Sequence, residues 1–95
     1  MVKAMWNGKE IARSDHTVIV ENNHYFPSSD VDHTFLLESD YHTTCPWKGF
    51  ASYYTLDVNG ERNENAAWYY KEPKEGAEVV KDRIAFWKGV EVLEE

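Results

Sequence analysis

Short strand-like stretches separated by turn-forming dipeptides occupy the first part of the chain. Asn7-Gly8 accepts the positive φ of a tight hairpin turn, and β-forming residues flank it on both sides. Thr17–Glu21 (TVIVE) is rich in β-branched residues, which fit a pleated surface, and Asn22-Asn23 follows it as a second turn signal. The pattern therefore predicts two hairpins, with strands over residues 2–6, 10–14, 17–21 and 24–26.

The strongest local pattern is a third hairpin in the middle of the chain. Side chains of residues 50–56 alternate between two largely apolar faces, Asn59-Gly60 supplies the turn, and residues 66–70 alternate again on the return. Residues at equal distances from such a turn face one another, so Tyr53 is expected opposite Asn65-Ala66.

The remaining segments predict short elements of both kinds. Pro27–Asp30 resembles a single helical turn, because serine and aspartate side chains satisfy free backbone amides at helix starts. A second short helical turn is expected over residues 77–81, and strands over residues 34–38, 84–87 and 90–93. Many short strands joined by tight turns indicate an all-β fold, a small antiparallel barrel-like or tent-like β domain with one or two short helical turns.

Length and composition narrow the class of protein. Ninety-five residues suit one domain over residues 1–95. A formal charge of −7 repels a phosphate backbone, so nucleic acid is not an expected partner. A lone cysteine excludes an internal disulfide, and no apolar stretch approaches the roughly 20 residues that span a bilayer. We expect no membrane insertion and a cytoplasmic location.

Residues 42–54 (HTTCPWKGFASYY) contain four aromatic rings and the only cysteine, yet Lys48 is their only formal charge. A lone cation among apolar neighbours must reach water or meet an anion. Tyr53, Trp68 and Tyr70 are expected as neighbouring rings on paired strands, with Lys48 and Thr44 supplying polar contacts at the rim. Such rings fill the core of a small β domain as readily as they line a site, and Lys48 favours the site.

Three other hypotheses, a zinc site, a nucleophilic cysteine and a divalent-metal site, are alternatives to ligand binding by the aromatic rings. His42 and Cys45 have a spacing that suits zinc, but structural zinc commonly takes four ligands with paired cysteines. Cys45 would need a lowered thiol pKa to act as a nucleophile, and Lys48 is the cation near enough in sequence to lower it. Asp30 and Asp32 resemble the pair of carboxylates that holds a divalent metal ion in nucleotidyltransferases, although no Gly-rich phosphate-binding loop precedes them. The further zinc ligands considered are His33, His24 and His16.

Order and spacing from Thr43 onward, in TTCPWKG, ASYY, ENAAWYY and KEP, resemble a small family known as domain of unknown function 427. Its catalogue label reads nucleotidyltransferase domain. The resemblance implies a single compact β domain, related to the tent-like folds of zinc-bearing ligand modules, and implies no established activity. The positions that match the family's signature are Cys45, Pro46, Lys48, Gly49, Ala51, Tyr53, Asn65, Trp68 and Tyr70.

These observations together predict a binding module without a cofactor or a bound metal. Its expected ligand is a small anionic or amide-bearing molecule, or the end of a peptide. One alternative is a metal-dependent nucleotidyltransferase-like enzyme that uses Asp30, Asp32 and Lys48, and another is a homo-oligomer formed through exposed rings. Nothing in the sequence requires catalysis. The candidate ligand-binding residues are Thr44, Cys45, Lys48, Tyr53, Asn65, Trp68 and Tyr70.

Overall fold

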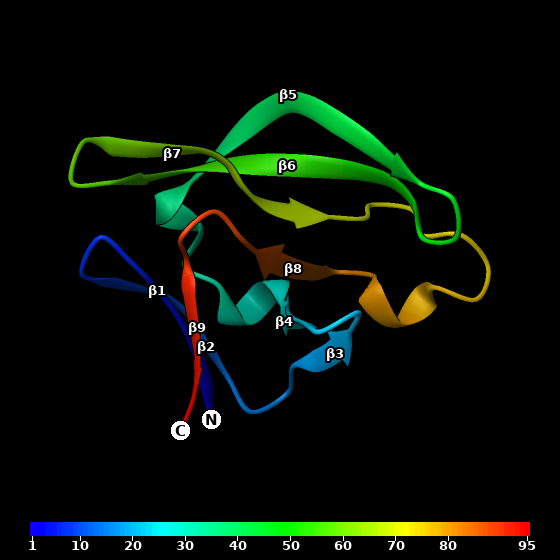
Figure 1. Ribbon diagram of the computed structural model, residues 1–95, viewed down its shortest axis with the longest axis horizontal. Coiled ribbons are helices and arrows are strands. Elements are labelled where there is room, and N and C mark those ends of the chain that lie inside the picture. Colours follow the sequence, from blue (N-terminus) through cyan, green and yellow to red (C-terminus); the bar gives the residue numbers. More distant parts are fainter.

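Two antiparallel sheets form the computed structural model, which describes residues 1–95 (Figure 1). The smaller sheet has the strand order β2-β1-β9, and the larger has the order β3-β4-β8-β7-β6-β5. The strands are β1 (Val2–Trp6), β2 (Lys9–Ser14), β3 (Val18–Val20), β4 (Asn23–Pro27), β5 (Leu36–Cys45), β6 (Gly49–Val58), β7 (Glu61–Tyr69), β8 (Arg83–Phe86) and β9 (Glu91–Glu94). Three one-turn 3-10 helices join them, namely η1 (Ser28–Asp30), η2 (His33–Phe35) and η3 (Glu78–Val80).

The all-β class predicted from the turn signals is confirmed, but the sheets do not close into a barrel. In the larger sheet β3 and β5 are edge strands with a neighbour on one side only. The chain also has three short helical turns rather than one or two. None of these turns is long and apolar enough to cross a membrane.

Two local predictions were wrong by a few residues. The β3–β4 turn is centred on Glu21 and Asn22, which have φ values of 52° and 66°, one residue earlier than expected. Thr34 lies in η2 rather than in a strand, because the Asp32 carboxylate accepts hydrogen bonds from the Thr34 amide and hydroxyl. A side-chain cap of this kind favours a helical turn over an extended start to β5.

The β6–β7 hairpin has the predicted turn but not the predicted register. Val58 pairs with Glu61 beside the turn, whereas Tyr53 pairs with Trp68 instead of Asn65-Ala66. The register shifts between Tyr54 and Leu56, where Asn65 on β7 has a φ of 57°. A β-bulge therefore adds residues to β7 and brings Trp68 directly opposite Tyr53.

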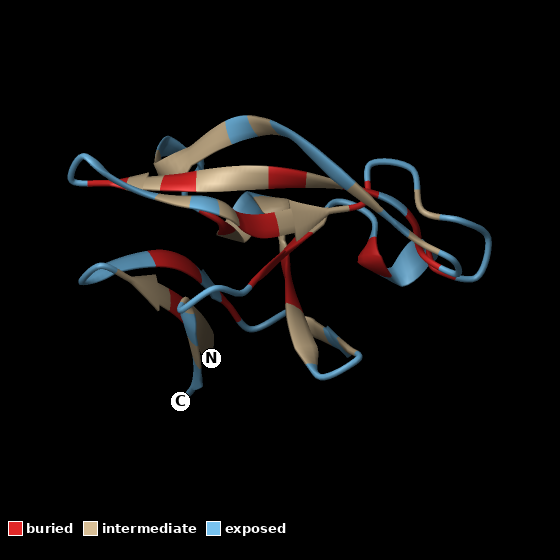
Figure 2. Ribbon diagram, turned by 45° about the horizontal axis from the view of Figure 1, so that its top comes forward, coloured by how far each residue is buried: buried red, intermediate tan, exposed pale blue.

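Buried side chains lie on both faces of the larger sheet. One cluster, with Leu56 and Phe26, fills the space between the two sheets and includes Ala4 and Ile11 from the smaller one. A second cluster, with Tyr25 and Tyr53, lies on the other face of the larger sheet. Buried segments occur in strands of both sheets, whereas the tips of the β1–β2, β3–β4 and β6–β7 hairpins are exposed (Figure 2). Alternation along β6 gives each face its own side chains.

Candidate functional site

Lys48 lies in the turn between β5 and β6 and is buried, with an exposed fraction of only 5%. Two contacts hold this turn in place: the Lys74 amide donates to the Lys48 carbonyl (3.0 Å), and the Lys74 ammonium donates to the Pro46 carbonyl (2.9 Å). Gly49 follows with a φ of 117°, in the region that favours glycine. The turn therefore directs the Lys48 side chain inward, over the second cluster.

The Lys48 ammonium meets one carboxylate, one hydroxyl and three rings. It donates to Glu21 and, at 3.4 Å, to the hydroxyl of Tyr25. Its nitrogen lies 5.9 Å from the ring centroid of Tyr25, 5.4 Å from that of Trp47 and 5.5 Å from that of Tyr70. Distances below about 6 Å are those of cation–π attraction. Glu21 itself is exposed on its turn, with 54% of its side chain accessible.

The electrostatics of this group are consistent with its contacts. Burial lowers the pKa of the Lys48 ammonium, but the Glu21 carboxylate and the phenols of Tyr25 and Tyr70 together raise it above its ordinary value. The hydrogen bond from Lys48 lowers the pKa of the Glu21 carboxyl. Burial raises the pKa of Tyr70 to about 12, although the nearby ammonium opposes this shift. At neutral pH Lys48 is therefore a cation beside the neutral phenol of Tyr70.

Paired strands bring the predicted rings together. Tyr53 on β6 pairs with Trp68 on β7, and the Trp68 indole donates to the Tyr25 hydroxyl at 3.2 Å. The rings of Tyr25 and Trp68 are perpendicular, with centroids 6.1 Å apart. The Tyr53 hydroxyl shares a 2.9 Å hydrogen bond with Thr43. These contacts fix the ring orientations by hydrogen bonds at their polar ends.

Trp87 completes the wall and was missed by sequence reasoning. Its ring centroid is 6.0 Å from that of Trp68 and 6.5 Å from that of Tyr53, yet 44% of the residue is exposed. Its indole donates to the Asn65 carbonyl at 2.6 Å. Asn65 is thus a positioning residue at the bulge. The sequence signal that could have identified Trp87 is the alternation of Ile84–Trp87 (IAFW), which places Trp87 on the same face as Ala85.

A hollow of about 160 Å³ remains between these side chains. Lys48, Tyr53, Trp68, Tyr70 and Trp87 line it. Four of the seven residues predicted from sequence therefore share one cavity, and we call these five residues the aromatic cavity.

The other predicted residues lie outside the lining. Cys45 is a free, half-buried thiol packed against the second cluster. Thr44 is exposed and pairs with Phe50. Because side chains alternate across a strand, Thr44 faces away from Thr43, whose hydroxyl reaches Tyr53. The rim contact expected of Thr44 is thus made by Thr43.

The metal-binding alternatives lack a gathered ligand set. The Asp30 carboxylate accepts from the Ser14 hydroxyl at 2.6 Å, and Asp32 accepts from its own neighbour Thr34. The His42 ring stacks on Phe50, with centroids 4.5 Å apart. No three histidine, cysteine, aspartate or glutamate side chains lie together in a group that could hold a metal ion.

One family model matches residues 1–95, and its description reads domain of unknown function (DUF427). The match confirms the resemblance identified from the TTCPWKG, ASYY and ENAAWYY segments. No curated protein matches the chain. With a family model matched along residues 1–95 and a small all-β fold around the signature residues, the chain belongs to the family of the domain of unknown function DUF427.

Proposed function

We propose that this protein is a binding module whose aromatic cavity takes a small anionic or amide-bearing molecule, with a carboxylate-bearing end such as a peptide C-terminus as the best fit. The observation that carries the proposal is the position of Lys48: its ammonium is shielded from water yet borders a cavity walled by four rings. Burying a lysine is costly unless its charge is paired.

The partner of Lys48 supports a carboxylate as the ligand group. Its ammonium already binds the carboxylate of Glu21, a side chain that is more than half exposed on a two-residue turn. A ligand carboxylate that replaced Glu21 would keep the ammonium paired, and the released Glu21 would be hydrated. Exchange of one carboxylate for another therefore avoids the desolvation penalty of an unpaired buried charge.

The size and lining of the cavity favour an end group over a whole cofactor. Its volume of about 160 Å³ is small beside the roughly 300–1,000 Å³ of pockets that enclose drug-sized ligands. Tyr53, Trp68, Tyr70 and Trp87 offer flat surfaces on which an amide plane packs. One amide with an adjoining carboxylate matches both features.

Thermal-shift measurements with two matched probes test this proposal. N-acetylglycine carries an amide and a carboxylate, whereas N-acetylglycinamide lacks the charge. We expect N-acetylglycine to raise the melting temperature more than N-acetylglycinamide does, because only its carboxylate pairs with the Lys48 ammonium. A ligand at 100 times its dissociation constant adds about 2.7 kcal/mol to the free energy of unfolding. The Lys48→Met variant keeps the apolar stem of the side chain but loses the ammonium, and it should lose this stabilisation.

Lys88→Met is the matched control, because Lys88 also has its ammonium over a tryptophan ring, 5.1 Å from the Trp87 centroid, but is exposed. It should retain the response to N-acetylglycine. Equal stabilisation of wild type and Lys48→Met, or equal effects of the two probes, would contradict the proposal.

A further inference from the structure

A second hollow lies on the opposite face of the larger sheet from the aromatic cavity. Its volume is about 300 Å³. Tyr54 and Tyr69, which line it, pack with the cluster between the sheets, whereas Tyr53 and Trp68 belong to the other face. The residues that line it are Ser28, Tyr54, Tyr69, Tyr70, Lys71, Asp82, Arg83 and Ile84.

The hollow lies where the pairing between β7 and the β8 segment is interrupted, before an isolated bridge joins Tyr70 to Lys81. The ladder between β7 and β8 consists of two pairs, Ala67 with Phe86 and Trp68 with Ala85. Beyond these pairs Tyr69 and Ile84 would be the next partners, but no ladder joins them. The space between the strands is therefore floored by Ile84, which is buried, and bounded by the Tyr69 ring.

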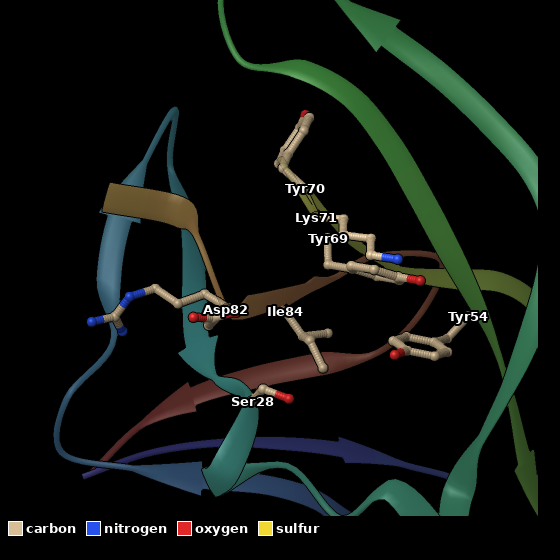
Figure 3. Close-up of a pocket in the computed structure, with 8 residues that line it drawn as sticks. Ser28, Tyr54, Tyr69, Tyr70, Lys71, Asp82 and Ile84 are labelled. Carbon is tan, nitrogen blue, oxygen red and sulfur yellow. The ribbon is translucent and has the colours of Figure 1, made fainter. Parts of the chain in front are cut away.

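Hydroxyl groups converge on this apolar floor. Figure 3 shows the hydroxyl of Tyr54 pointing toward Ile84, with the Ser28 hydroxyl near the other end of the Ile84 side chain. The Tyr54 ring stacks on Tyr69, with centroids 4.7 Å apart and planes at 22°. His33 holds the Ser28 hydroxyl at 3.0 Å. Burial is the main cause that raises the pKa of Tyr54 to about 12, and the neighbouring Tyr69 and Glu38 add to the shift. Its phenol is therefore a hydrogen-bond donor at neutral pH.

The charged groups around the hollow divide into two ends. Asp82 lies on one side in Figure 3, and the Lys71 ammonium lies on the other with the two tyrosines. Neither Lys71 nor Asp82 forms an ion pair. The Arg83 guanidinium donates to the backbone carbonyls of His16 and Tyr25, which leaves Lys71 as the available cation.

From this arrangement we infer that the hollow is a second binding site, for a planar molecule with an anionic group at one end and a hydrogen-bond donor at the other. The anionic group binds the Lys71 ammonium with the Tyr54 and Tyr69 hydroxyls. The donor binds the Asp82 carboxylate, and the flat body packs on Ile84. Tyr70 lines both hollows, but its ring points away from this one (Figure 3), so the inference does not rest on the function proposed for the aromatic cavity.

Titration of the isotope-labelled protein with 4-aminobenzoate, benzoate and aniline tests the inference by NMR. The three probes share one ring and carry both end groups, the anion alone and the amine alone. We expect 4-aminobenzoate to bind most tightly and to shift the backbone amide resonances of Tyr54, Tyr69 and Ile84. Lys71→Met should weaken 4-aminobenzoate binding by about tenfold, the usual size of a lost charged hydrogen bond, and leave aniline binding unchanged.

Asp82→Asn tests the other end, because asparagine tolerates the left-handed backbone at this position, where φ is 59°. It should reduce the preference for 4-aminobenzoate over benzoate, because the amide oxygen of asparagine accepts a hydrogen bond more weakly than a carboxylate does. Lys9→Met, at the start of β2 in the smaller sheet, and Lys48→Met should both leave 4-aminobenzoate affinity unchanged. The inference is overturned if no probe shifts these three resonances up to its solubility limit, or if Lys71→Met binds 4-aminobenzoate as tightly as wild type.

Discussion

Removing a single oxygen atom, in Tyr25→Phe, should weaken the fold and disturb the aromatic cavity together. The Tyr25 hydroxyl is the shared acceptor of the Trp68 indole at 3.2 Å and of the Lys48 ammonium at 3.4 Å. Tyr25 has no exposed surface, so water cannot reach the vacated position without a rearrangement. Phenylalanine keeps the perpendicular contact with the Trp68 ring, because that contact needs only the carbon skeleton.

The magnitude follows from the two contacts. A neutral hydrogen bond contributes about 1 kcal/mol net, and a hydrogen bond to a charged group contributes somewhat more, about 1.5–3 kcal/mol. The Lys48 contact is long and Lys48 keeps its bond to Glu21, so the lower end of the range applies to it. The sum is about 2.5 kcal/mol of unfolding free energy, or roughly 10–20 °C in melting temperature for a domain of this size.

Urea unfolding followed by tryptophan fluorescence measures this loss. The midpoint should fall while the slope with urea concentration stays constant, since the surface exposed on unfolding is unchanged. Tyr41→Phe is the control, because Tyr41 is 47% exposed and the hydrogen bond of this residue, to the Ser39 hydroxyl, comes from its backbone amide. A Tyr25→Phe variant as stable as the Tyr41→Phe variant would refute the role assigned to this hydroxyl.

Two further predictions concern the buried phenol of Tyr70 and the β-bulge at Asn65. Burial raises the pKa of Tyr70 to about 12 in the folded protein, whereas the phenol ionises near pH 10 in the unfolded chain. Between about pH 10 and pH 12 the unfolded chain therefore binds fewer protons than the folded protein. The free energy of unfolding should therefore fall as pH rises through this window, and urea midpoints for wild type and Tyr70→Phe should show a shallower fall in the variant. At the bulge, Asn65→Gly and Asn65→Ala both lose the hydrogen bond from the Ser39 hydroxyl, but Asn65→Ala should cost about 1 kcal/mol more than Asn65→Gly, because alanine resists a φ of 57°. Equal urea midpoints for the two Asn65 variants would contradict the bulge as the source of the β6–β7 register.

The elements that sequence reasoning predicted well are those fixed by neighbouring residues. Asn7-Gly8 and Asn59-Gly60 form the expected hairpin turns, because asparagine and glycine carry the required positive φ themselves. The helical turns at Ser28–Asp30 and Glu78–Val80 were also predicted. In the hairpin of β6 and β7, alternation placed Tyr53, Trp68 and Tyr70 on one face, and the bulge left that parity unchanged because it shifts the pairing by two residues.

The features that could not be predicted depend on contacts between distant segments. The left-handed conformation of Asn65 coincides with hydrogen bonds from Ser39 and Trp87, which lie 26 and 22 residues away. The pairing of Lys48 with Glu21 crosses 27 residues and joins the β5–β6 turn to the β3–β4 turn, although these two hairpins stand at opposite ends of the strand order. Thr44 was preferred to Thr43 because the end of β5 was not recognised as a strand, so its alternation was not applied.

The most direct test of the aromatic cavity follows the four tryptophan indole N–H resonances by NMR during titration with N-acetylglycine. The account predicts that the resonances of Trp68 and Trp87, which line the cavity, shift with one common dissociation constant. Trp6, which belongs to the smaller sheet, should stay unchanged. If the Trp68 and Trp87 resonances remain fixed at saturating probe, or move no more than Trp6, the cavity does not bind the proposed ligand class.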